Sequence, residues 1–203
     1  MLDHFEGRSI RFNVPSFEDV PTMVLWIQSQ TYGETMGSIS ALISYNQAQM
    51  IAASWCDANK DKVPTDITFI VRNKINLNPM GFVKISRINW IARNCELSCF
   101  LSEGYITKGF GPDILLTSVR YIFEELNLER LYGRVFGSNV NSDRICSIVA
   151  EDIGVLKDSF YLNGRFEDVH VIEVSREAYK NKIYSDDRLI KYIANRYNLI
   201  KNS

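Results

Sequence analysis

One short stretch, Tyr105–Asp113, constrains the fold of this chain more than any other. It follows an apolar run that is typical of a strand and opens the most helix-like segment of the sequence. Gly109 and Gly111 allow a tight turn and a close approach of the backbone to a ligand, because neither carries a Cβ. Pro112 suits the first position of a helix. Such a loop presents unpaired N–H donors at the positive end of a helix dipole, so the stretch predicts a strand, an anion-binding loop and a helix.

The rest of the chain supplies strands and helices around this loop. Residue periodicity, turn residues and helix starts predict the following elements. Before the loop we expect a strand over 9–14, a helix starting at Ser16, a helix over 39–60, and strands over 66–72, 80–85 and 95–101. After it we expect a helix over 112–127, a strand over 130–136, a helix over 139–150, and a hairpin of strands 155–162 and 166–174 around Asn163-Gly164. This order predicts an α+β (mixed α/β) single domain.

Two glycines, Gly33 and Gly37, precede the second expected helix. They predict a loose segment, because glycine weakens helices. We expect this segment to form one wall of a substrate pocket.

Composition excludes several classes of partner. Lys and Arg number 23 against 24 Asp and Glu, so the near-zero net charge gives no electrostatic reason to expect nucleic acid or an anionic membrane as a partner. The first residues, Met1–Glu6, lack the basic start and apolar run of a secretory signal, and no apolar run approaches the ~20 residues of a membrane span. We therefore expect a cytoplasmic location.

The four cysteines, Cys56, Cys95, Cys99 and Cys146, form no CxxC pair, and only two histidines accompany them. Zinc sites need closely spaced ligands of these types. The sequence therefore predicts reduced cysteines and no metal.

The end of the chain, residues 176–203, differs from the rest because it is polar and rich in tyrosine. Leu189, Ile190, Ile193 and Ala194 could share one helical stripe. We expect a helical tail that packs on the domain or mediates self-association, and a homodimer is kept open.

Several segments in this order resemble the GNAT superfamily of acyl-CoA-dependent N-acetyltransferases, particularly the branch of the ribosomal-protein alanine and spermidine acetyltransferases. The resemblance runs from about Met80 to Glu173, with a weaker part from Ser9 to Ile27. The segments that carry it are Trp90–Leu97, Gly109–Gly111, Phe123–Leu131, Asn139–Ser142 and Phe160–Val169. It implies a GNAT-like, mostly antiparallel twisted sheet flanked by helices, over residues 1–175.

The same resemblance implies a site for acetyl-CoA as the acyl donor. Backbone N–H groups of the loop would hold the pyrophosphate, and the strand before it would line the pantetheine arm. The residues implied are Leu97, Ser98, Cys99, Phe100, Leu101, Lys108, Gly109, Phe110, Gly111, Pro112 and Asn139. Two residues depart from the family pattern: Ile106 stands where Arg or Gln is usual, and Asp113 adds a negative charge that would repel phosphate, which Lys108 would offset.

Amine acetylation needs a base and groups that stabilise the departing thiolate. Glu96 is the candidate base, since its neighbours are apolar and burial would raise its pKa, although a structural carboxylate fits equally. Cys146 stands where the family has a proton-donating tyrosine, and it is either a donor or a small buried hydrophobe. Asn139 and Ser142 resemble the polar pair near the thioester, but both also suit helix caps.

The resemblance implies transfer of an acetyl or short acyl group from acetyl-CoA to a primary amine, by direct attack in a ternary complex. The near-neutral charge favours a small acceptor, such as an amino sugar or polyamine. The alternatives are a protein N-terminal acetyltransferase of the ribosomal-protein type and a non-catalytic acyl-CoA-binding or interaction module.

Overall fold

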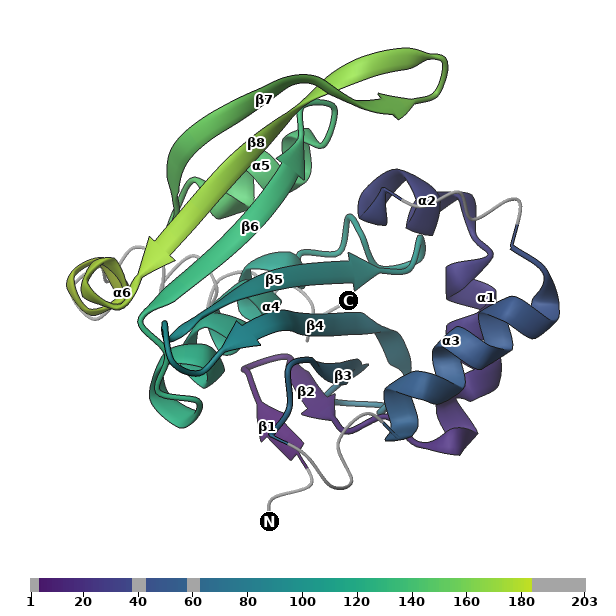
Figure 1. The fold of residues 1–203 in the computed structure, drawn as a ribbon. Helices are drawn as coiled ribbons and strands as arrows, with labels where there is room; N and C mark the ends of the chain where they lie inside the picture. Colours follow the sequence, from purple (N-terminus) through teal and green to yellow (C-terminus); the bar gives the residue numbers. More distant parts are fainter. Residues whose placement is uncertain (1–3, 38–42, 58–62, 184–203) are drawn as a thin grey trace.

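The computed structural model describes residues 4–37, 43–57 and 63–183, and within them one eight-stranded sheet forms the centre of the molecule (Figure 1). Its strands lie in the order β1-β2-β3-β4-β5-β6-β8-β7, and every neighbouring pair is antiparallel except β5 and β6. The strands are β1 (His4–Glu6), β2 (Ile10–Asn13), β3 (Ile67–Asn73), β4 (Pro79–Asn89), β5 (Asn94–Leu101), β6 (Arg130–Phe136), β7 (Glu151–Leu162) and β8 (Arg165–Ser175). The predicted mixed α/β class with a mostly antiparallel sheet is confirmed.

Helices cover the sheet in two groups. A 3-10 turn (Phe17–Asp19), α1 (Val20–Ile27), α2 (Gln30–Met36) and α3 (Tyr45–Asp57) form the first group, and α4 (Gly111–Arg120), a π-helical turn (Tyr121–Glu125), α5 (Val140–Cys146) and α6 (Arg176–Ile183) form the second. Successive side chains along each strand point to opposite faces of the sheet, so the strands contribute to two buried clusters, one on each face. Ile70, Phe82 and Phe100 pack with α1 and α3, whereas Phe69, Val71 and Cys95 pack with α4 and the π-helical turn.

Most expected elements are present, with shifted ends. The hairpin turn at Asn163-Gly164 has φ values of 51° and 85°, the left-handed pair that a two-residue turn of this kind requires. The helix expected over 139–150 is shorter, because it ends at Cys146 and the chain enters β7 at Glu151 rather than at Val155.

The segment around Gly33 and Gly37 is helical, so the prediction of a loose segment was wrong. Ser29 caps α2, since its hydroxyl accepts the N–H of Tyr32, and Gly37 ends the helix at φ 65°. A Cβ on Gly37 would lie 2.9 Å from the Phe136 ring and 3.0 Å from the Phe160 ring. Gly37 therefore ends α2 and allows the close approach of this helix end to Phe136 of β6 and Phe160 of β7.

The parallel pairing of β5 with β6 is short. Asn94, Cys95 and Glu96 pair with Arg130, Leu131 and Tyr132. Beyond these residues β5 pairs only with β4, and β6 only with β8, in the described part of the chain. The two strands therefore diverge, and the facing backbone N–H and C=O groups of residues 97–101 are left available to a ligand.

The described part of the tail packs on the domain. α6 begins directly after β8. Its Tyr179 is 5% exposed and its ring lies tilted against that of Phe123, with 5.4 Å between ring centroids. The predicted apolar stripe of Leu189, Ile190, Ile193 and Ala194 lies outside the described residues. Among the described helices, none has the length and apolar character to cross a membrane.

Candidate active site

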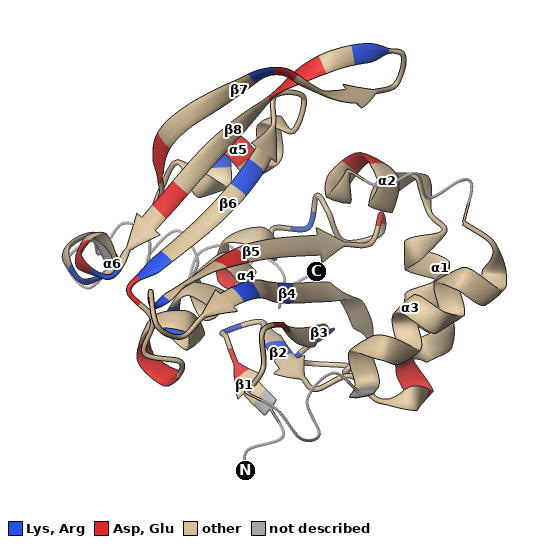
Figure 2. Ribbon diagram, in the orientation of Figure 1, with Lys and Arg blue, Asp and Glu red and all other residues tan. Residues whose placement is uncertain are grey.

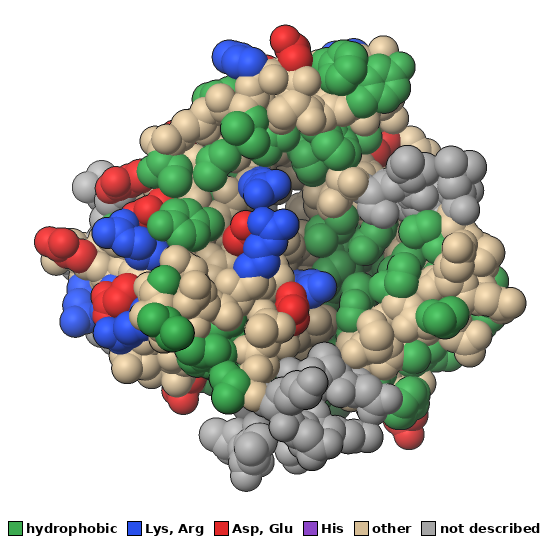
Figure 3. All heavy atoms as spheres, in the orientation of Figure 1, with side chains coloured by type: hydrophobic (Ala, Val, Ile, Leu, Met, Phe, Trp, Pro, Cys, Tyr) green, Lys and Arg blue, Asp and Glu red, His purple; other side chains and the backbone are tan. Residues whose placement is uncertain are grey.

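The divergence of β5 from β6 opens a cavity of about 450 Å³. β5 and β6 form two of its walls, α5 and the hairpin β7–β8 the others, and Thr35, Met36 and Gly37 at the end of α2 close it. Figure 3 shows the corresponding face of the molecule hollowed between the hairpin and β5, with apolar side chains inside the hollow and basic and acidic ones beside it. The expectation that the segment ending at Gly37 forms one wall of a pocket agrees with this lining.

A second cavity of about 550 Å³ continues from the first toward the glycine loop. It is lined by Ile106, Gly111 and Ile114 on the loop side, and by α2 and the hairpin tip on the other. The two cavities share lining residues, namely Thr35, Cys99, Leu115, Asn139, Ser142 and Cys146. They therefore form one continuous groove, from the glycine loop to the gap between β5 and β6.

The loop has the geometry of an anion cradle. Gly109 has φ 84°, a conformation that favours glycine, and a Cβ on Gly111 would lie 2.9 Å from Ile145 Cδ1. The N–H groups of Gly109, Phe110 and Gly111 have no backbone partner among the described residues, and they precede the first turn of α4. These N–H groups fit a phosphate at the helix N-terminus.

Two residues that were implied to bind the phosphate through backbone N–H groups, Lys108 and Pro112, have no free N–H group. The N–H of Lys108 donates to the carbonyl of Tyr105 at 3.2 Å, and Pro112 has no N–H. The Lys108 ammonium lies over the Tyr105 ring at 5.1 Å from its centroid. Within the loop, the free N–H groups that could bind phosphate are therefore those of Gly109–Gly111. Ile106 contributes an apolar wall to the cavity.

The side chains of β5, the strand implied to line the pantetheine arm, point to both faces of the sheet. Leu97, Ser98, Cys99 and Leu101 line the groove. The Phe100 side chain does not, because it is 1% exposed and packs in the cluster with Trp26 and Phe82 on the α1 side of the sheet. Strand alternation turns this side chain away from the groove, so a contact of Phe100 with the pantetheine arm would be made by its backbone.

Asp113 does not face the anion cradle as a free charge, contrary to the expected repulsion. Its side chain is 6% exposed, and its two oxygens accept hydrogen bonds from the N–H groups of Arg8 and Ser9 and from the Ser9 hydroxyl. The bonds satisfy the carboxylate on the side of the β1–β2 turn.

Glu96 lines the first cavity, but it is neither isolated nor fully buried. Its Oε1 accepts a hydrogen bond from Arg87 at 2.8 Å and lies 3.8 Å from Arg134 across the opening between β5 and β6. Arg87 sits in a bulge of β4 with φ 52°, which turns its side chain toward Glu96. With 29% of the Glu96 side chain exposed, the expected burial of this carboxylate is only partial.

Of the two roles that the sequence left open for Asn139 and Ser142, the structure shows the helix cap, which Asn139 provides. Asn139 is the N-cap of α5, since its side-chain oxygen accepts the N–H of Ser142 at 3.0 Å. Both residues also line both cavities. The cap therefore holds the start of α5 at the point where the cavities meet.

Cys99 and Cys146 both line the groove. Burial raises the pKa of Cys146 to about 11, with a further contribution from the Asp143 carboxylate. Burial raises the pKa of Cys99 to about 12, and the neighbouring Cys146 adds to this. Both thiols are consequently protonated at neutral pH.

We expect Cys146 to react with iodoacetamide at pH 8 about 100-fold more slowly in the folded protein than in the urea-unfolded chain, because the thiolate is the reactive form. The labelling rate should rise as the pH approaches 11. Mass spectrometry of the peptide that contains Cys146 measures this rate. Equal rates in the folded and unfolded chains would contradict the raised pKa.

Sequence reasoning missed the part of the site that comes from β6. Gly133, Arg134 and Phe136 line the first cavity, although they carry no motif. A Cβ on Gly133 would lie 3.1 Å from the Ile172 side chain, but this tight contact is with a distant part of the sequence and gives no local signal. These residues become part of the site only because β6 diverges from β5.

Charges along the groove are mixed. The carboxylates of Glu34, Glu96, Glu103 and Glu167 outnumber the guanidinium groups of Arg134 and Arg165 among the lining residues. Figure 2 shows acidic and basic residues spread over the ribbon without a long run of one sign. No group of three or more His, Cys, Asp or Glu that could hold a metal ion occurs among the described residues.

A sheet that opens between two parallel strands, beside a glycine loop and a helix N-terminus, is the arrangement expected of an acyltransferase that uses coenzyme A. Residues 10–148 match the model of the acetyltransferase (GNAT) domain family. The match covers more than half of the chain, which therefore belongs to the GNAT acetyltransferase family.

Among curated proteins, the spermidine N(1)-acetyltransferase of Vibrio cholerae serotype O1 is 30% identical over 108 residues. The aligned region is 52% of this chain and 61% of that relative, so the chain matches less than two thirds of the relative's length.

Solved structures of the V. cholerae enzyme share the fold. The spermidine N-acetyltransferase in complex with CoA and spermine has a TM-score of 0.75 at 19% identity, covering 84% of this chain and 98% of that one. A dodecameric structure of the enzyme in an intermediate state has a TM-score of 0.67 at 19% identity, covering 88% and 99%.

Proposed function

We propose that this protein transfers an acetyl group from acetyl-CoA to a primary amine of a small polycationic molecule of the polyamine class. The observation that carries the proposal is the continuous groove, which joins the glycine loop to the opening between β5 and β6. The loop end suits an anionic phosphate, and the other end has room for an acceptor.

In the proposed reaction, the N–H groups of Gly109–Gly111 bind the pyrophosphate of acetyl-CoA. The unpaired edge of β5 along Leu97–Leu101 holds the pantetheine arm. Asn139, the cap of α5, lies where the cavities meet and would bind the cofactor near the thioester. The thioester carbon then lies at the opening between the strands.

We assign proton transfer to groups that line this opening. Glu96 accepts the proton of the attacking amine directly or through water, and the amine forms the new C–N bond as the C–S bond breaks. Cys146, which is in the thiol form at neutral pH, gives its proton to the departing CoA thiolate. Ser142 offers a hydroxyl to the developing oxyanion.

Two features support a cationic acceptor. Carboxylates are in excess along the groove, which favours the entry of positive charge. The curated relative acts, by its name, on spermidine. An amino sugar is the second acceptor class, because its amine is also small and cationic.

Binding and turnover together test the proposal. Isothermal titration with acetyl-CoA is expected to give a dissociation constant in the micromolar range, and mass spectrometry should detect acetylated spermidine or spermine only when protein and acetyl-CoA are both present. The same assay is run with two further amine acceptors, glucosamine and a peptide with an N-terminal alanine, which complete the amine panel. Detecting the acetylated amine avoids interference from the protein's own cysteines.

Each outcome separates one class of function. No binding at millimolar acetyl-CoA would reject the enzyme and leave an interaction scaffold. Binding without any acetylated amine would indicate an acyl-CoA-binding module, and acetylation of the peptide alone would indicate a protein N-terminal acetyltransferase.

Assembly and location are part of the same proposal. The related V. cholerae enzyme is dodecameric in one solved structure, so we propose that this chain forms a multimer, and light scattering would give its size. The homodimer is the smallest such assembly. A cytoplasmic location, where acetyl-CoA is made and used, stays a prediction, as do the domain limits 1–175 and 176–203.

A further inference from the structure

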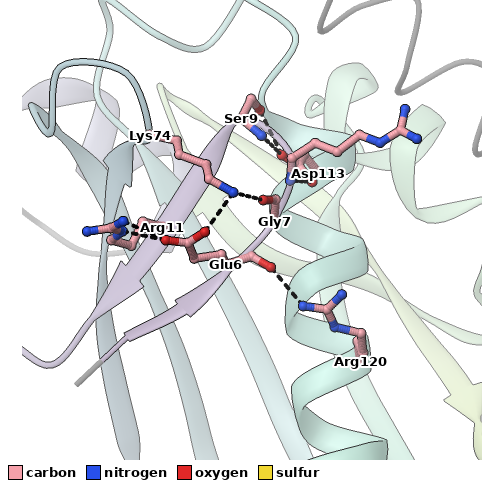
Figure 4. Close-up of polar contacts among 8 residues, drawn as sticks. Glu6, Gly7, Ser9, Arg11, Lys74, Asp113 and Arg120 are labelled. Carbon is pink, nitrogen blue, oxygen red and sulfur yellow. Dashed lines mark hydrogen bonds and ion pairs between the residues drawn. The ribbon is translucent and has the colours of Figure 1, made fainter. Parts of the chain in front are cut away.

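The end of β1 and the turn between β1 and β2 contact α4 at Asp113 and at Arg120. Figure 4 shows Asp113 near one end of the helix and Arg120 near the other, and both reach the segment Glu6–Ser9. The helix therefore contacts one short piece of backbone at two separate points.

At the N-terminal end of α4, Asp113 accepts three hydrogen bonds. The Arg8 N–H donates to Oδ1 at 3.1 Å, and the Ser9 N–H and hydroxyl each donate to Oδ2 at 2.7 Å. The Asp113 side chain is 6% exposed, and Ser9 is 104 residues away in the sequence. A buried carboxylate is tolerated because donors satisfy it, and its place in the first helical turn is favoured by the helix dipole.

At the other end, Arg120 donates to the Glu6 carbonyl at 2.7 Å and lies over the Phe5 ring at 4.4 Å from its centroid. Lys74 adds a hydrogen bond to the Gly7 carbonyl at 3.2 Å. These contacts are all made to backbone groups or to the neighbouring ring, so they fix the path of the turn.

Gly7 allows the close approach of this turn to the helix. A Cβ at this position would lie 2.6 Å from Thr117 Oγ1 and 2.7 Å from Asp113 Oδ1. The turn and the helix are therefore in direct contact, with no room for a side chain between them.

The first turn of α4, which Asp113 joins to Arg8 and Ser9, follows directly on the anion-binding loop Gly109–Gly111. The Ile114 N–H donates to the Phe110 carbonyl at 3.0 Å, and the Phe110 side chain is 1% exposed. Gly111 is the first residue of α4. Because this hydrogen bond and the buried Phe110 side chain join the loop to the first turn, we expect a shift of that turn to move the N–H groups of Gly109–Gly111.

We propose that Asp113 is a positioning residue for the coenzyme A loop, which it serves by fastening the first turn of α4 to the Gly7–Ser9 turn. The inference rests on the proposed function, because it assumes that the loop binds the pyrophosphate. It gives the negative charge beside an anion site a role: the carboxylate is bonded to N–H groups of another element, and it sets the direction of the free N–H groups.

The test compares Asp113→Ala with a matched control, Asp19→Ala. Asp19 is also 6% exposed and holds a turn by accepting from the Ser16 N–H at 3.0 Å and hydroxyl at 3.2 Å, and it pairs with Arg72. It is not among the residues that line the groove. Loss of the Asp113 bonds is expected to raise the dissociation constant for acetyl-CoA by about tenfold or more, as for hydrogen bonds to a charged group, with the KM of the amine unchanged. Asp19→Ala should stay within about twofold of wild type in both constants, whatever stability it loses.

A second readout needs no ligand. Hydrogen exchange of the amides of residues 105–115 in the free protein should speed up in Asp113→Ala and not in Asp19→Ala. If Asp113→Ala does not fold, Asp113→Asn and Ser9→Ala carry the same test, because each removes only part of the bonding, and intermediate effects are expected.

The outcomes distinguish this inference from the proposed function. Unchanged exchange and unchanged acetyl-CoA affinity in the Asp113 variants would overturn the positioning role while leaving the function intact. Equal effects of the Asp113 and Asp19 variants would reduce Asp113 to a general stability role. Failure of the wild-type protein to bind acetyl-CoA would reject the proposed function, and the exchange data would still decide whether Asp113 orders the loop.

Discussion

Replacing Gly81 by alanine is expected to lower the free energy of unfolding by about 3 kcal/mol or more, because the new Cβ has no space. Gly81 in β4 faces Leu101 in β5, and its Cβ would lie 2.0 Å from the Phe100 carbonyl oxygen and 3.0 Å from the Leu101 Cα. These are backbone atoms, so no side-chain rotation relieves the contact. The two strands have to separate, which also disturbs the packing of Phe82 on Phe100, whose ring centroids lie 5.4 Å apart.

Urea denaturation followed by circular dichroism measures this loss. Gly154→Ala in β7 is the matched control, since no atom lies within 4 Å of a Cβ at that position, and its unfolding free energy should change by less than about 0.5 kcal/mol. A Gly81→Ala protein as stable as the control would show that β4 and β5 can adjust without cost.

Replacing Glu96 by glutamine is expected to lower the turnover number by at least about 100-fold at neutral pH, if the carboxylate accepts the amine proton. Glutamine keeps the shape of the side chain and an oxygen that can accept the Arg87 hydrogen bond, but it cannot take up a proton. The dissociation constant for acetyl-CoA should stay nearly unchanged. Steady-state kinetics with the acceptor found in the amine panel, together with calorimetry, measure both quantities.

Glu173→Gln is the control for this substitution. Glu173 also pairs with an arginine, Arg130, but it is not among the residues that line the two cavities. Its turnover should stay within about twofold of wild type, because its carboxylate does not line the groove. If Glu96→Gln keeps full turnover, the base is another group; if it loses acetyl-CoA affinity in proportion, Glu96 binds or supports the donor instead.

The sequence was sufficient to predict the elements whose signals are local. Asn163-Gly164 marks a tight turn wherever it stands between strands, and Gly111-Pro112 marks a helix start, so the hairpin and the loop with its helix could be predicted. Asn139 could be expected to cap a helix, because its role depends on residues only a few positions away.

Features that depend on distant contacts could not be predicted. Phe100 and Leu101 are equally apolar, and only the packing of α1 decides which face of β5 is covered. Asp113 looked like an obstacle to phosphate because its partners, Arg8 and Ser9, belong to the far end of the sequence. The two arginines near Glu96 could not be predicted, because Arg87 reaches it through a bulge and Arg134 lies on the parallel strand β6.

The short pairing between β5 and β6 gives this sheet inner edges as well as outer ones. Exposed strand edges usually invite another chain to pair with them, which is a common route to aggregation. Here the inner edges face a groove that α2 and the hairpin β7–β8 enclose, so a second polypeptide has little access to them. A slender molecule with amide groups of its own can enter and satisfy the same N–H and C=O groups. We therefore expect the gap between β5 and β6 to select ligands by size, and a bound acyl donor to form hydrogen bonds to both halves of the sheet.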